Sequence, residues 1–200
     1  MTKQLAFHFQ QEACGGCFTC QIACKDKNDL EVGQLYRRVR EFAGGGYQQA
    51  GNAIVPNVYA YWLSMSCNHC QQPLCVKNCP TGAMQKRAED GIVFVDQGKC
   101  IGCRYCVMSC PYGAPQYNPK QGKTGKCDLC RDLLAQGKPP VCVAACPTRV
   151  LHYGLLSELQ QKYGSTSQVK GMPDPQRTNP SLVITPHRDA IADSKENSNG

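Results

Sequence analysis

The cysteines of this chain constrain its fold more than any other residue type, because they occur in four groups of four. The 200-residue sequence contains sixteen cysteines, and every one belongs to a group. In chain order the groups are Cys14, Cys17, Cys20 and Cys24; Cys67, Cys70, Cys75 and Cys79; Cys100, Cys103, Cys106 and Cys110; and Cys127, Cys130, Cys142 and Cys146. Four thiolates are the ligand set of a cubane iron–sulfur cluster. The grouping therefore predicts four [4Fe–4S] clusters.

The spacing within each group is that of a loop wrapped around a cluster. The first and third groups read C-x2-C-x2-C-x3-C, the second C-x2-C-x4-C-x3-C and the fourth C-x2-C-x11-C-x3-C. Such a loop turns its first three thiolates toward one cluster. The fourth cysteine follows the third by four residues, which is about 6 Å along the axis of a helical turn. It is therefore expected to bind a second cluster, as it does in two-cluster ferredoxins.

This exchange of the fourth cysteine pairs the groups. The second and third groups are adjacent and alike, so they are expected to pair with each other, which leaves the first and fourth to pair around them. Site I then takes Cys14, Cys17, Cys20 and Cys146; site II takes Cys24, Cys127, Cys130 and Cys142; site III takes Cys67, Cys70, Cys75 and Cys110; and site IV takes Cys79, Cys100, Cys103 and Cys106. One two-cluster module is predicted to be inserted into the other.

The expected fold class is α+β, with two nested ferredoxin-like bis-[4Fe–4S] modules, short β-hairpins and helices, and an extended C-terminal arm. Module A is expected over 1–35 and 119–164, a β-rich insertion over 36–62, module B over 63–118, and the arm over 165–200. Alternation predicts strands at Leu5–Phe9, Leu35–Arg40, Val58–Met65, Val150–Tyr153 and Ser181–Thr185, a hairpin of Ala83–Arg87 with Ile92–Asp96, and a helix over Leu155–Tyr163.

Two segments are expected to lack regular structure. The run Gly44-Gly45-Gly46 predicts a flexible turn, since no lysine–serine pair follows to make it a phosphate loop. The polar stretch Asp189–Gly200 is expected to be disordered, and the arm as a whole to lie on a partner or back over the body.

Zinc and disulfides are the alternatives to clusters. Structural zinc also takes four cysteines, typically as two separate pairs. Three cysteines within seven residues, and groups that end three times in Cys-Pro, fit that pattern poorly. An even cysteine count is compatible with disulfides, but no secretory signal is expected at the N-terminus. His69 lies between Cys67 and Cys70, and since site III already has four ligands we expect a hydrogen-bonding or surface role for it.

The formal charge of +7 counts every cysteine as neutral. Each oxidised cluster with its four thiolates carries about −2, so four loaded sites would leave the protein near −1. The basic residues are therefore expected to compensate the clusters in part, and Lys99, Arg104, Lys126 and Arg131 lie beside or close to ligand cysteines. A nucleic-acid partner is not expected, because no nucleic-acid-binding motif accompanies the charge.

The sequence contains none of the common motifs of catalytic sites. It contains no G-x-G-x-x-G, H-E-x-x-H or Walker loop, and no cysteine remains outside the four groups to leave an iron atom open to substrate. No apolar run approaches the roughly 18 residues of a membrane span. We expect a non-catalytic electron carrier with no membrane segment of its own.

The chain resembles the four-cluster electron-transfer subunits of the molybdopterin oxidoreductases, and within them the dimethyl sulfoxide reductase branch. The matching stretches are Cys14–Lys25, Ser66–Met84, Cys100–Asn118, Lys126–Cys130 and Cys142–Pro147. Some relatives in that family carry tryptophan at the position of Cys103 and hold a three-iron cluster. The cysteine found here implies four [4Fe–4S] clusters.

The resemblance implies a complex of three kinds of subunit. A catalytic subunit holds the molybdopterin cofactor, an integral membrane anchor oxidises quinol, and this chain relays single electrons between them in anaerobic respiration. Membrane contact would be through the anchor alone. Co-export with the catalytic subunit would place the chain on the periplasmic face of the cytoplasmic membrane, with a cytoplasmic location as the alternative. The alternative function is a polyferredoxin-type electron subunit of a formate dehydrogenase, a hydrogenase or a polysulfide or thiosulfate reductase.

Overall fold

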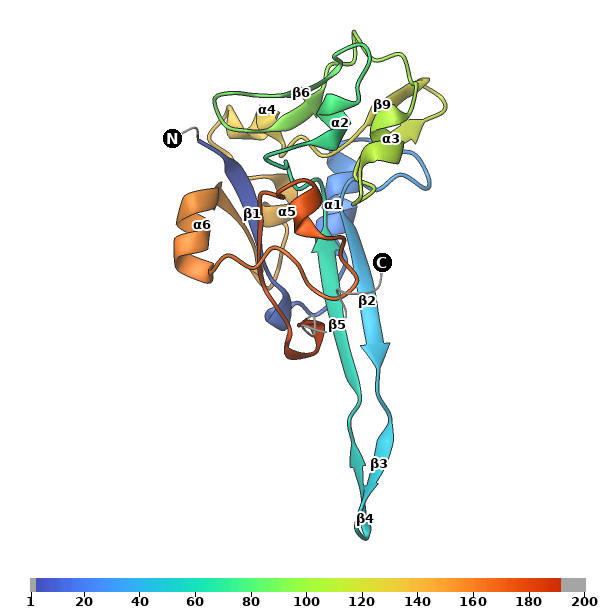
Figure 1. The fold of residues 1–200 in the computed structure, drawn as a ribbon, viewed down its shortest axis with the longest axis vertical. Coiled ribbons are helices and arrows are strands. Elements are labelled where there is room, and N and C mark those ends of the chain that lie inside the picture. Colours follow the sequence, from blue (N-terminus) through green and yellow to red (C-terminus); the bar gives the residue numbers. More distant parts are fainter. Residues whose placement is uncertain (1–2, 192–200) are drawn as a thin grey trace.

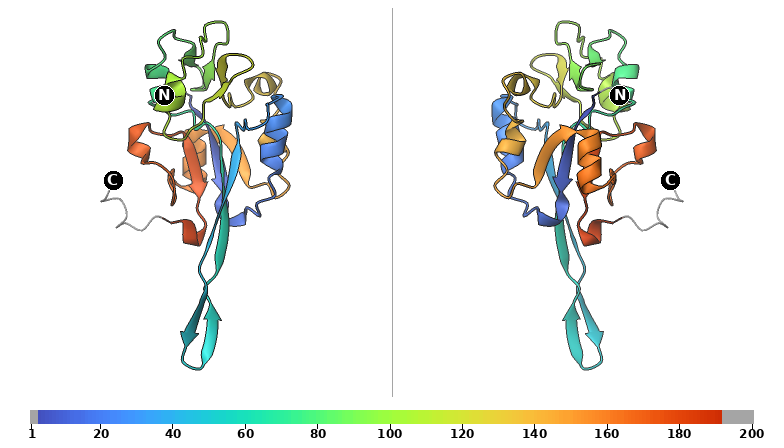
Figure 2. Two further views of the ribbon diagram at one scale, coloured as in Figure 1. Left: turned by 90° about the vertical axis from the view of Figure 1, so that its right-hand side faces the viewer. Right: turned by 90° about the vertical axis from the view of Figure 1, so that its left-hand side faces the viewer.

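A three-stranded sheet joins the two ends of the chain in the computed structural model, which describes residues 3–191. Strand β1 (Leu5–Gln10) lies in the middle, antiparallel to β10 (Leu151–Leu155) and parallel to β11 (Leu182–Thr185). The three strands predicted in these regions are thus confirmed. Helix α6 (Leu156–Tyr163) covers one face of the sheet (Figure 2) and ends at Gly164, as its leucine spacing predicts.

Alternation along β1 decides what each face of the sheet contacts. Ala6 faces α6 and packs with Leu156 and Leu159. Phe7 and Phe9 point to the opposite face, where the buried core also contains several of the cysteines. The sheet therefore separates an ordinary hydrophobic layer from the cysteine-rich part of the molecule.

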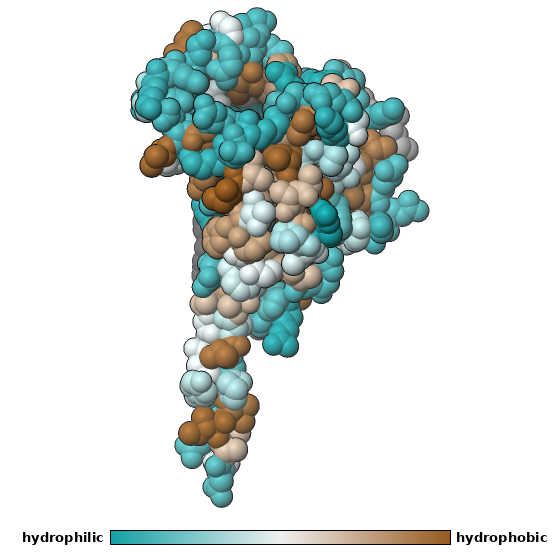
Figure 3. Space-filling view, turned by 180° about the vertical axis from the view of Figure 1, so that it is seen from behind, coloured by the Kyte–Doolittle hydropathy of each residue, from teal (hydrophilic) through white to brown (hydrophobic). Residues whose placement is uncertain are grey.

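A long β arm projects from the body (Figure 1). Its base pairs β2 (Arg38–Gly44) with β5 (Tyr59–Met65), and its tip pairs β3 (Tyr47–Ala50) with β4 (Ala53–Pro56). Every residue of β3 and β4 is exposed, and apolar side chains gather near the end of the arm (Figure 3). The strand predicted at Val58–Met65 is confirmed, whereas the one predicted at Leu35–Arg40 begins later, at Arg38.

The prediction of a flexible turn at the triple glycine is wrong. The chain continues outward past Gly46, and the arm reverses instead at Gly51, whose φ is +63°. Gly45 has a φ of +86°, and a Cβ atom there would lie 2.2 Å from the carbonyl oxygen of Asn57. The glycines thus let two strands approach closely at the junction between the base and the tip.

Short helices carry the later cysteines of each group. They are α1 (Thr19–Lys27), α2 (Leu74–Lys77), α3 (Tyr105–Ser109) and α5 (Val141–Ala144), with α4 (Arg131–Leu134) between the halves of the fourth group. Helix α1 packs against α5, and α2 packs against α3. Two small antiparallel hairpins lie near them, β6 (Met84–Lys86) with β7 (Val93–Val95) and β8 (Gln116–Asn118) with β9 (Lys123–Gly125). The first of these hairpins is the one that the sequence predicts.

The C-terminal segment lies back on the body. Backbone amides of Gln71 and Gln72 donate to the carbonyls of Asn179 and Thr178 at 2.7 and 3.0 Å, next to the second cysteine group. Three short 3-10 helices complete the described part of the chain, namely Gln11–Ala13, Pro175–Arg177 and Arg188–Ala190.

The expected disorder from Asp189 onward is wrong for its first residues. Ala190 is fully buried, and its carbonyl accepts a hydrogen bond from the amide of Lys170. The remainder of that stretch, 192–200, lies outside the described residues. The observed mixture of short strands and short helices agrees with the expected fold class, while the nesting of two modules stays a prediction.

Candidate iron–sulfur cluster sites

All four cysteine groups use the same backbone turn. The residue before the second cysteine has a left-handed conformation in each group: Gly16 (φ +67°), His69 (+45°), Gly102 (+70°) and Leu129 (+61°). This turn brings the amides of His69 and Leu129 to 3.4 Å from the Sγ atoms of Cys67 and Cys127, respectively. Concave backbone of this kind presents N–H groups to negative charge. The four loops are therefore shaped to hold anionic sulfur.

Glycine at two of these positions has a second cause. A Cβ atom on Gly16 would lie 2.3 Å from the indole ring of Trp62, and one on Gly102 would lie 2.1 Å from the carbonyl oxygen of Gly122. Backbone conformation and close packing both exclude larger residues there.

Each group also places its third and fourth cysteines one helical turn apart. Cys20 and Cys24 lie within α1, Cys106 lies within α3 with Cys110 at its end, and α2 and α5 carry Cys75 and Cys142 just before their fourth cysteines. Both thiols of the first group therefore leave α1 at different heights along its axis, as the C-x3-C spacing predicts, whereas in the other three groups the fourth cysteine follows the end of the helix.

Two cavities are lined by thiols from two groups each. One is bounded by Cys14, Cys17, Cys20 and Cys146, together with Phe9, Val39 and Leu151. The other is bounded by Cys79, Cys100, Cys103 and Cys106, together with Met84 and Val95. The structure thus brings together the residues predicted for sites I and IV. Four thiols around a largely apolar cavity form a donor set suited to a cubane cluster.

The residues predicted for sites II and III also lie together, deeper in the molecule. Burial, together with the neighbouring Cys142 and Cys130, raises the pKa of Cys24 to about 12. Burial likewise raises the pKa of Cys75, with contributions from Cys67, Cys110 and Cys70. Thiols with raised pKa values are protonated near neutral pH, so a metal that binds them must displace protons.

Two of the fourth cysteines share a local motif, Cys-Pro-Thr, at Cys79 and Cys146. Burial opposes ionisation of the Cys79 thiol, but hydrogen bonds from the Met84 amide and the Thr81 hydroxyl lower its pKa overall. The Val150 amide and the Thr148 hydroxyl lower the pKa of Cys146 in the same way. The threonine oxygens lie 3.8 and 3.7 Å from the respective sulfur atoms. The repeated motif therefore stabilises a thiolate.

Arg37 is a buried cation among the thiols that the sequence analysis missed. Its side chain is 2 % exposed, and it donates to the Ser64 carbonyl at 3.2 Å and to the Ser66 hydroxyl at 3.0 Å. Burial opposes its charge, but the surrounding cysteines, Cys142 and Cys20 foremost, raise its pKa above the ordinary value. Strand alternation gave no signal for it, because Arg37 precedes β2 and its hydrogen-bond partners lie 27 and 29 residues further along the chain.

The four basic residues that the sequence proposes as compensating charges differ in their surroundings. Lys126 is buried, and its ammonium donates to the carbonyl of Cys127 at 2.8 Å. The other three pair elsewhere: Lys99 with Asp96, Arg131 with Asp128, and Arg104 over the ring of Tyr117. Lys126 and Arg37 are therefore the cations buried beside the thiols in the described part of the chain.

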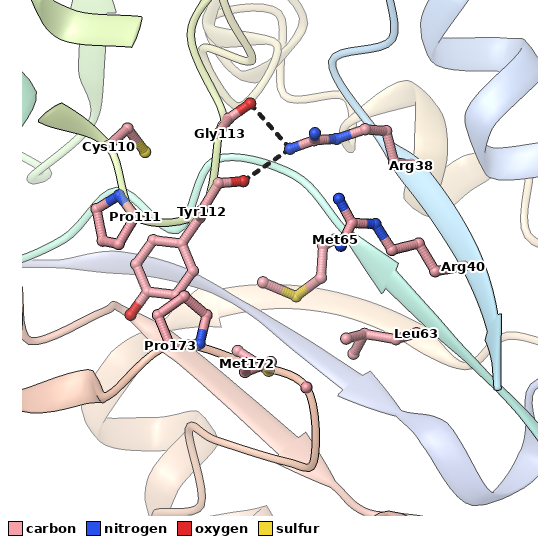
Figure 4. Close-up of a pocket in the computed structure, with 11 residues that line it drawn as sticks. Arg38, Arg40, Leu63, Met65, Cys110, Pro111, Tyr112, Gly113, Met172 and Pro173 are labelled. Carbon is pink, nitrogen blue, oxygen red and sulfur yellow. Dashed lines mark hydrogen bonds between the residues drawn. The ribbon is translucent and has the colours of Figure 1, made fainter. Parts of the chain in front are cut away.

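The base of the arm is fastened to the loop that carries Cys110. Arg38 of β2 donates to the carbonyls of Tyr112 and Gly113 at 2.8 and 2.9 Å (Figure 4). An open cavity beside this contact is lined by Arg38, Arg40 and the Cys110 loop. The base of the arm is thus attached next to one predicted ligand of site III.

Within residues 3–191, all sixteen cysteines are free thiols, and no three His, Cys, Asp or Glu side chains converge closely enough to hold a single metal ion. No helix within the same residues has the length and apolar character required to span a bilayer.

Comparison with known proteins shows the family of this chain. A family model described as a 4Fe–4S dicluster domain matches residues 58–156, which contain the second, third and fourth cysteine groups. The B subunit of the anaerobic dimethyl sulfoxide reductase of Escherichia coli is 50% identical over 187 residues, covering 94% of this chain and 91% of that protein. This chain belongs to that iron–sulfur subunit family.

Two further relatives also match, one of them with another reductase name. The B subunit of the Haemophilus influenzae anaerobic dimethyl sulfoxide reductase is 47% identical over 93% of this chain and 91% of its own length. The thiosulfate reductase electron transfer subunit of Salmonella typhi is 41% identical over 82% of this chain and 83% of its own length. The family resemblance drawn from the sequence is confirmed, and the chain is a non-catalytic electron-transfer subunit that binds [4Fe–4S] clusters.

Proposed function

We propose that sites I to IV each hold one [4Fe–4S] cluster and that the four clusters form a single path for electrons. The observation that carries this proposal is the gradient of exposure along the sites. Cys17 of site I and Cys103 of site IV are exposed, whereas Cys127 and Cys130 of site II and Cys67 and Cys75 of site III are buried. A path with accessible ends and a buried middle suits transfer between two partners.

The order of the sites along the path follows from neighbouring thiols. Cys20 of site I lies close enough to Cys142 of site II for their charges to interact. Cys127 of site II interacts in the same way with Cys67 of site III. Helices α2 and α3 pack together, and Asn78 donates to Ser109 across that contact at 2.9 Å, which joins site III to site IV. The proposed order is therefore I, II, III, IV.

The chemistry that each bound cluster supplies is reversible uptake of one electron. The residues of this chain would hold the cluster through thiolates and exclude water from sites II and III by burial. Backbone and side-chain N–H groups that donate to the thiolates stabilise the more negative, reduced form. Arg37, between sites I and II, adds a fixed positive charge with the same effect.

The partners proposed are a molybdopterin-containing catalytic subunit and an integral membrane anchor that oxidises quinol. The names of the relatives support a catalytic partner, since they are subunits of reductases. Membrane association would then be through the anchor, on the periplasmic face after co-export or, alternatively, on the cytoplasmic face. A dimethyl sulfoxide reductase is favoured by 50% identity, and a thiosulfate reductase is the second candidate, favoured by 41% identity.

The cluster count is tested by metal analysis of the protein purified anaerobically. Iron and acid-labile sulfide should each be near sixteen per chain, as four four-iron centres require. A zinc stoichiometry without broad visible absorption would overturn the proposal.

The exchange of fourth cysteines is tested by Cys79→Ser. We expect the paramagnetic signal of the cluster built on Cys100, Cys103 and Cys106 to be lost or altered, although Cys79 belongs to the preceding group. Cys110→Ser is the matched variant, and it should affect the cluster on Cys67, Cys70 and Cys75. The exchange would be disproved if Cys79→Ser affected only the cluster on Cys67, Cys70 and Cys75, and Cys110→Ser only the cluster on Cys100, Cys103 and Cys106.

The partners are tested by purification from native membranes with an affinity tag on this chain. We expect co-purification of a molybdenum-containing subunit and a polytopic membrane protein. Recovery of soluble partners alone would contradict the anchor.

A further inference from the structure

One histidine contacts ligands of two different cluster sites. His69 is 1 % exposed, and its backbone amide donates to the Sγ atom of Cys67, a site III ligand, at 3.4 Å. Its side-chain Nε2 lies 3.9 Å from the Sγ atom of Cys127, a site II ligand 58 residues further along the chain. The expected hydrogen-bonding role of His69 is confirmed, and a surface position is excluded. Its place between two sites is set by the tertiary structure.

The hydrogen bond at the other ring nitrogen fixes the tautomer. The backbone amide of Val93 donates to Nδ1 of His69 at 3.0 Å. Nδ1 must therefore keep its lone pair, so the ring is neutral and its single proton lies on Nε2. The Nε2–H group is directed at Cys127, and the thiolate of a loaded site II would accept a hydrogen bond from it.

The ring is held in place from several sides. The carbonyl of His69 accepts from the Ser181 hydroxyl at 3.0 Å and from the Gln4 side-chain amide at 3.3 Å, so both ends of the chain fasten this peptide. Lys126 donates to the Cys127 carbonyl at 2.8 Å and also to the carbonyl of Val93. The donor to Nδ1 and the acceptor of the Nε2 proton are thus tied together through Lys126.

The corresponding residues of the other groups cannot make this contact. His69 occupies the left-handed position that holds Gly16, Gly102 and Leu129 in the other loops. None of those side chains carries a hydrogen-bond donor. A left-handed, buried histidine is also costly compared with glycine. Leu129 shows that a buried side chain other than glycine is accepted at this position, so the feature that distinguishes His69 is its hydrogen-bond donor.

We propose that His69 sets the reduction potential of the site II cluster by donating a hydrogen bond from its Nε2–H group to the Cys127 thiolate. Because its backbone amide donates to Cys67, the same residue links the two inner clusters. This inference rests on the proposed assignment of sites II and III. One electron changes the charge of the loaded site from about −2 to about −3, and a donor to the thiolate stabilises the more negative state. His69 is a positioning and tuning residue, since it binds no iron itself.

The test compares His69→Phe with His69→Gln in the purified native complex. Phenylalanine fills the space without a donor, while glutamine keeps a side-chain N–H. Redox titration followed by electron paramagnetic resonance should show one cluster harder to reduce in His69→Phe. The expected change in its reduction equilibrium is roughly tenfold, or about 59 mV for a one-electron couple. His69→Gln should restore part of this shift.

The affected cluster is identified by Cys130→Ser, which should alter the same signal because Cys130 belongs to site II alone. His152→Phe is the control, since His152 stacks on Tyr163 of α6, on the other face of the central sheet. It should shift no cluster.

A second measurement uses the wild-type protein, so that the inference can still be tested if His69→Phe loses iron. With ¹⁵N-labelled histidine, pulsed electron paramagnetic resonance should detect a nitrogen coupled to the reduced site II cluster. Equal potentials in wild type and His69→Phe with all clusters retained would overturn the inference, as would absence of that coupling. Fewer than four clusters in the wild type would instead overturn the proposed function.

Discussion

At the scale of single residues, two adjacent glycines show which positions of a cysteine loop require a residue without a side chain. Gly15 has open space where a Cβ atom would be added, and its backbone is not left-handed. Gly16 is left-handed and lies against Trp62. The two residues differ by one position in the sequence and look equivalent there. The structure makes only the second one indispensable.

We therefore predict that Gly16→Ala damages site I and that Gly15→Ala does not. The left-handed backbone alone would cost the alanine variant about 1–2 kcal/mol, before the contact with Trp62 is relieved. Iron content and the paramagnetic signal of site I, followed on warming, measure the effect. Equal behaviour of the two variants would show that the loop adapts freely.

At the scale of elements, the short helices and the β arm have different roles in the fold. Helices α1, α2, α3 and α5 each carry the third cysteine of a group, and the fourth cysteine follows four residues later. The arm contributes its base, where β2 and β5 pair and Arg38 reaches the Cys110 loop. Its tip buries no side chain against the body. Cluster binding should therefore depend on the base of the arm and be independent of the tip.

Deletion of residues 47–56 tests this division. It would join Gly46 to Asn57, which already face each other across a hydrogen bond of 2.9 Å, as a two-residue hairpin turn. Iron content and visible absorption should equal those of the wild type, and the free energy of unfolding should change by less than about 0.5 kcal/mol. As the matched control, Arg38→Gln alters the base and should weaken the site III signal. Loss of clusters from the deletion variant would contradict the prediction.

At the scale of the whole molecule, the cysteines occupy positions that aliphatic side chains fill in other domains. Cys20, Cys67, Cys127, Cys142 and Cys146 belong to the main buried core, in contact with residues such as Phe7, Val39 and Leu63. Ligation therefore replaces part of the usual hydrophobic stabilisation, because a preformed site is not available in the unfolded chain.

Removal of iron is accordingly predicted to unfold the protein. Treatment with a chelator and an oxidant should abolish the cooperative thermal transition and make the body sensitive to protease. Far-ultraviolet circular dichroism and limited proteolysis measure this, with reconstitution by iron and sulfide as the control. A metal-free protein with the native spectrum and protease resistance would show that the apolar core suffices.

The sequence by itself determined the cofactor type, the grouping of the cysteines and most of the short strands. These properties depend on local spacing: two residues per strand repeat, four residues per helical turn, and four thiolates per cluster. The family resemblance followed from the same ligand runs. Local rules failed at the triple glycine, because its conformation is set by close contact with Asn57 on the opposite side of the arm.

Only the tertiary structure decided which charged and polar side chains reach the thiols. Arg37 and His69 act across gaps in the sequence, toward Ser64 and Cys142 in one case and toward Val93 and Cys127 in the other. The C-terminal strand likewise became part of the central sheet by pairing with β1. Contacts between distant segments arise from packing, and the spacing of cysteines carries no information about them.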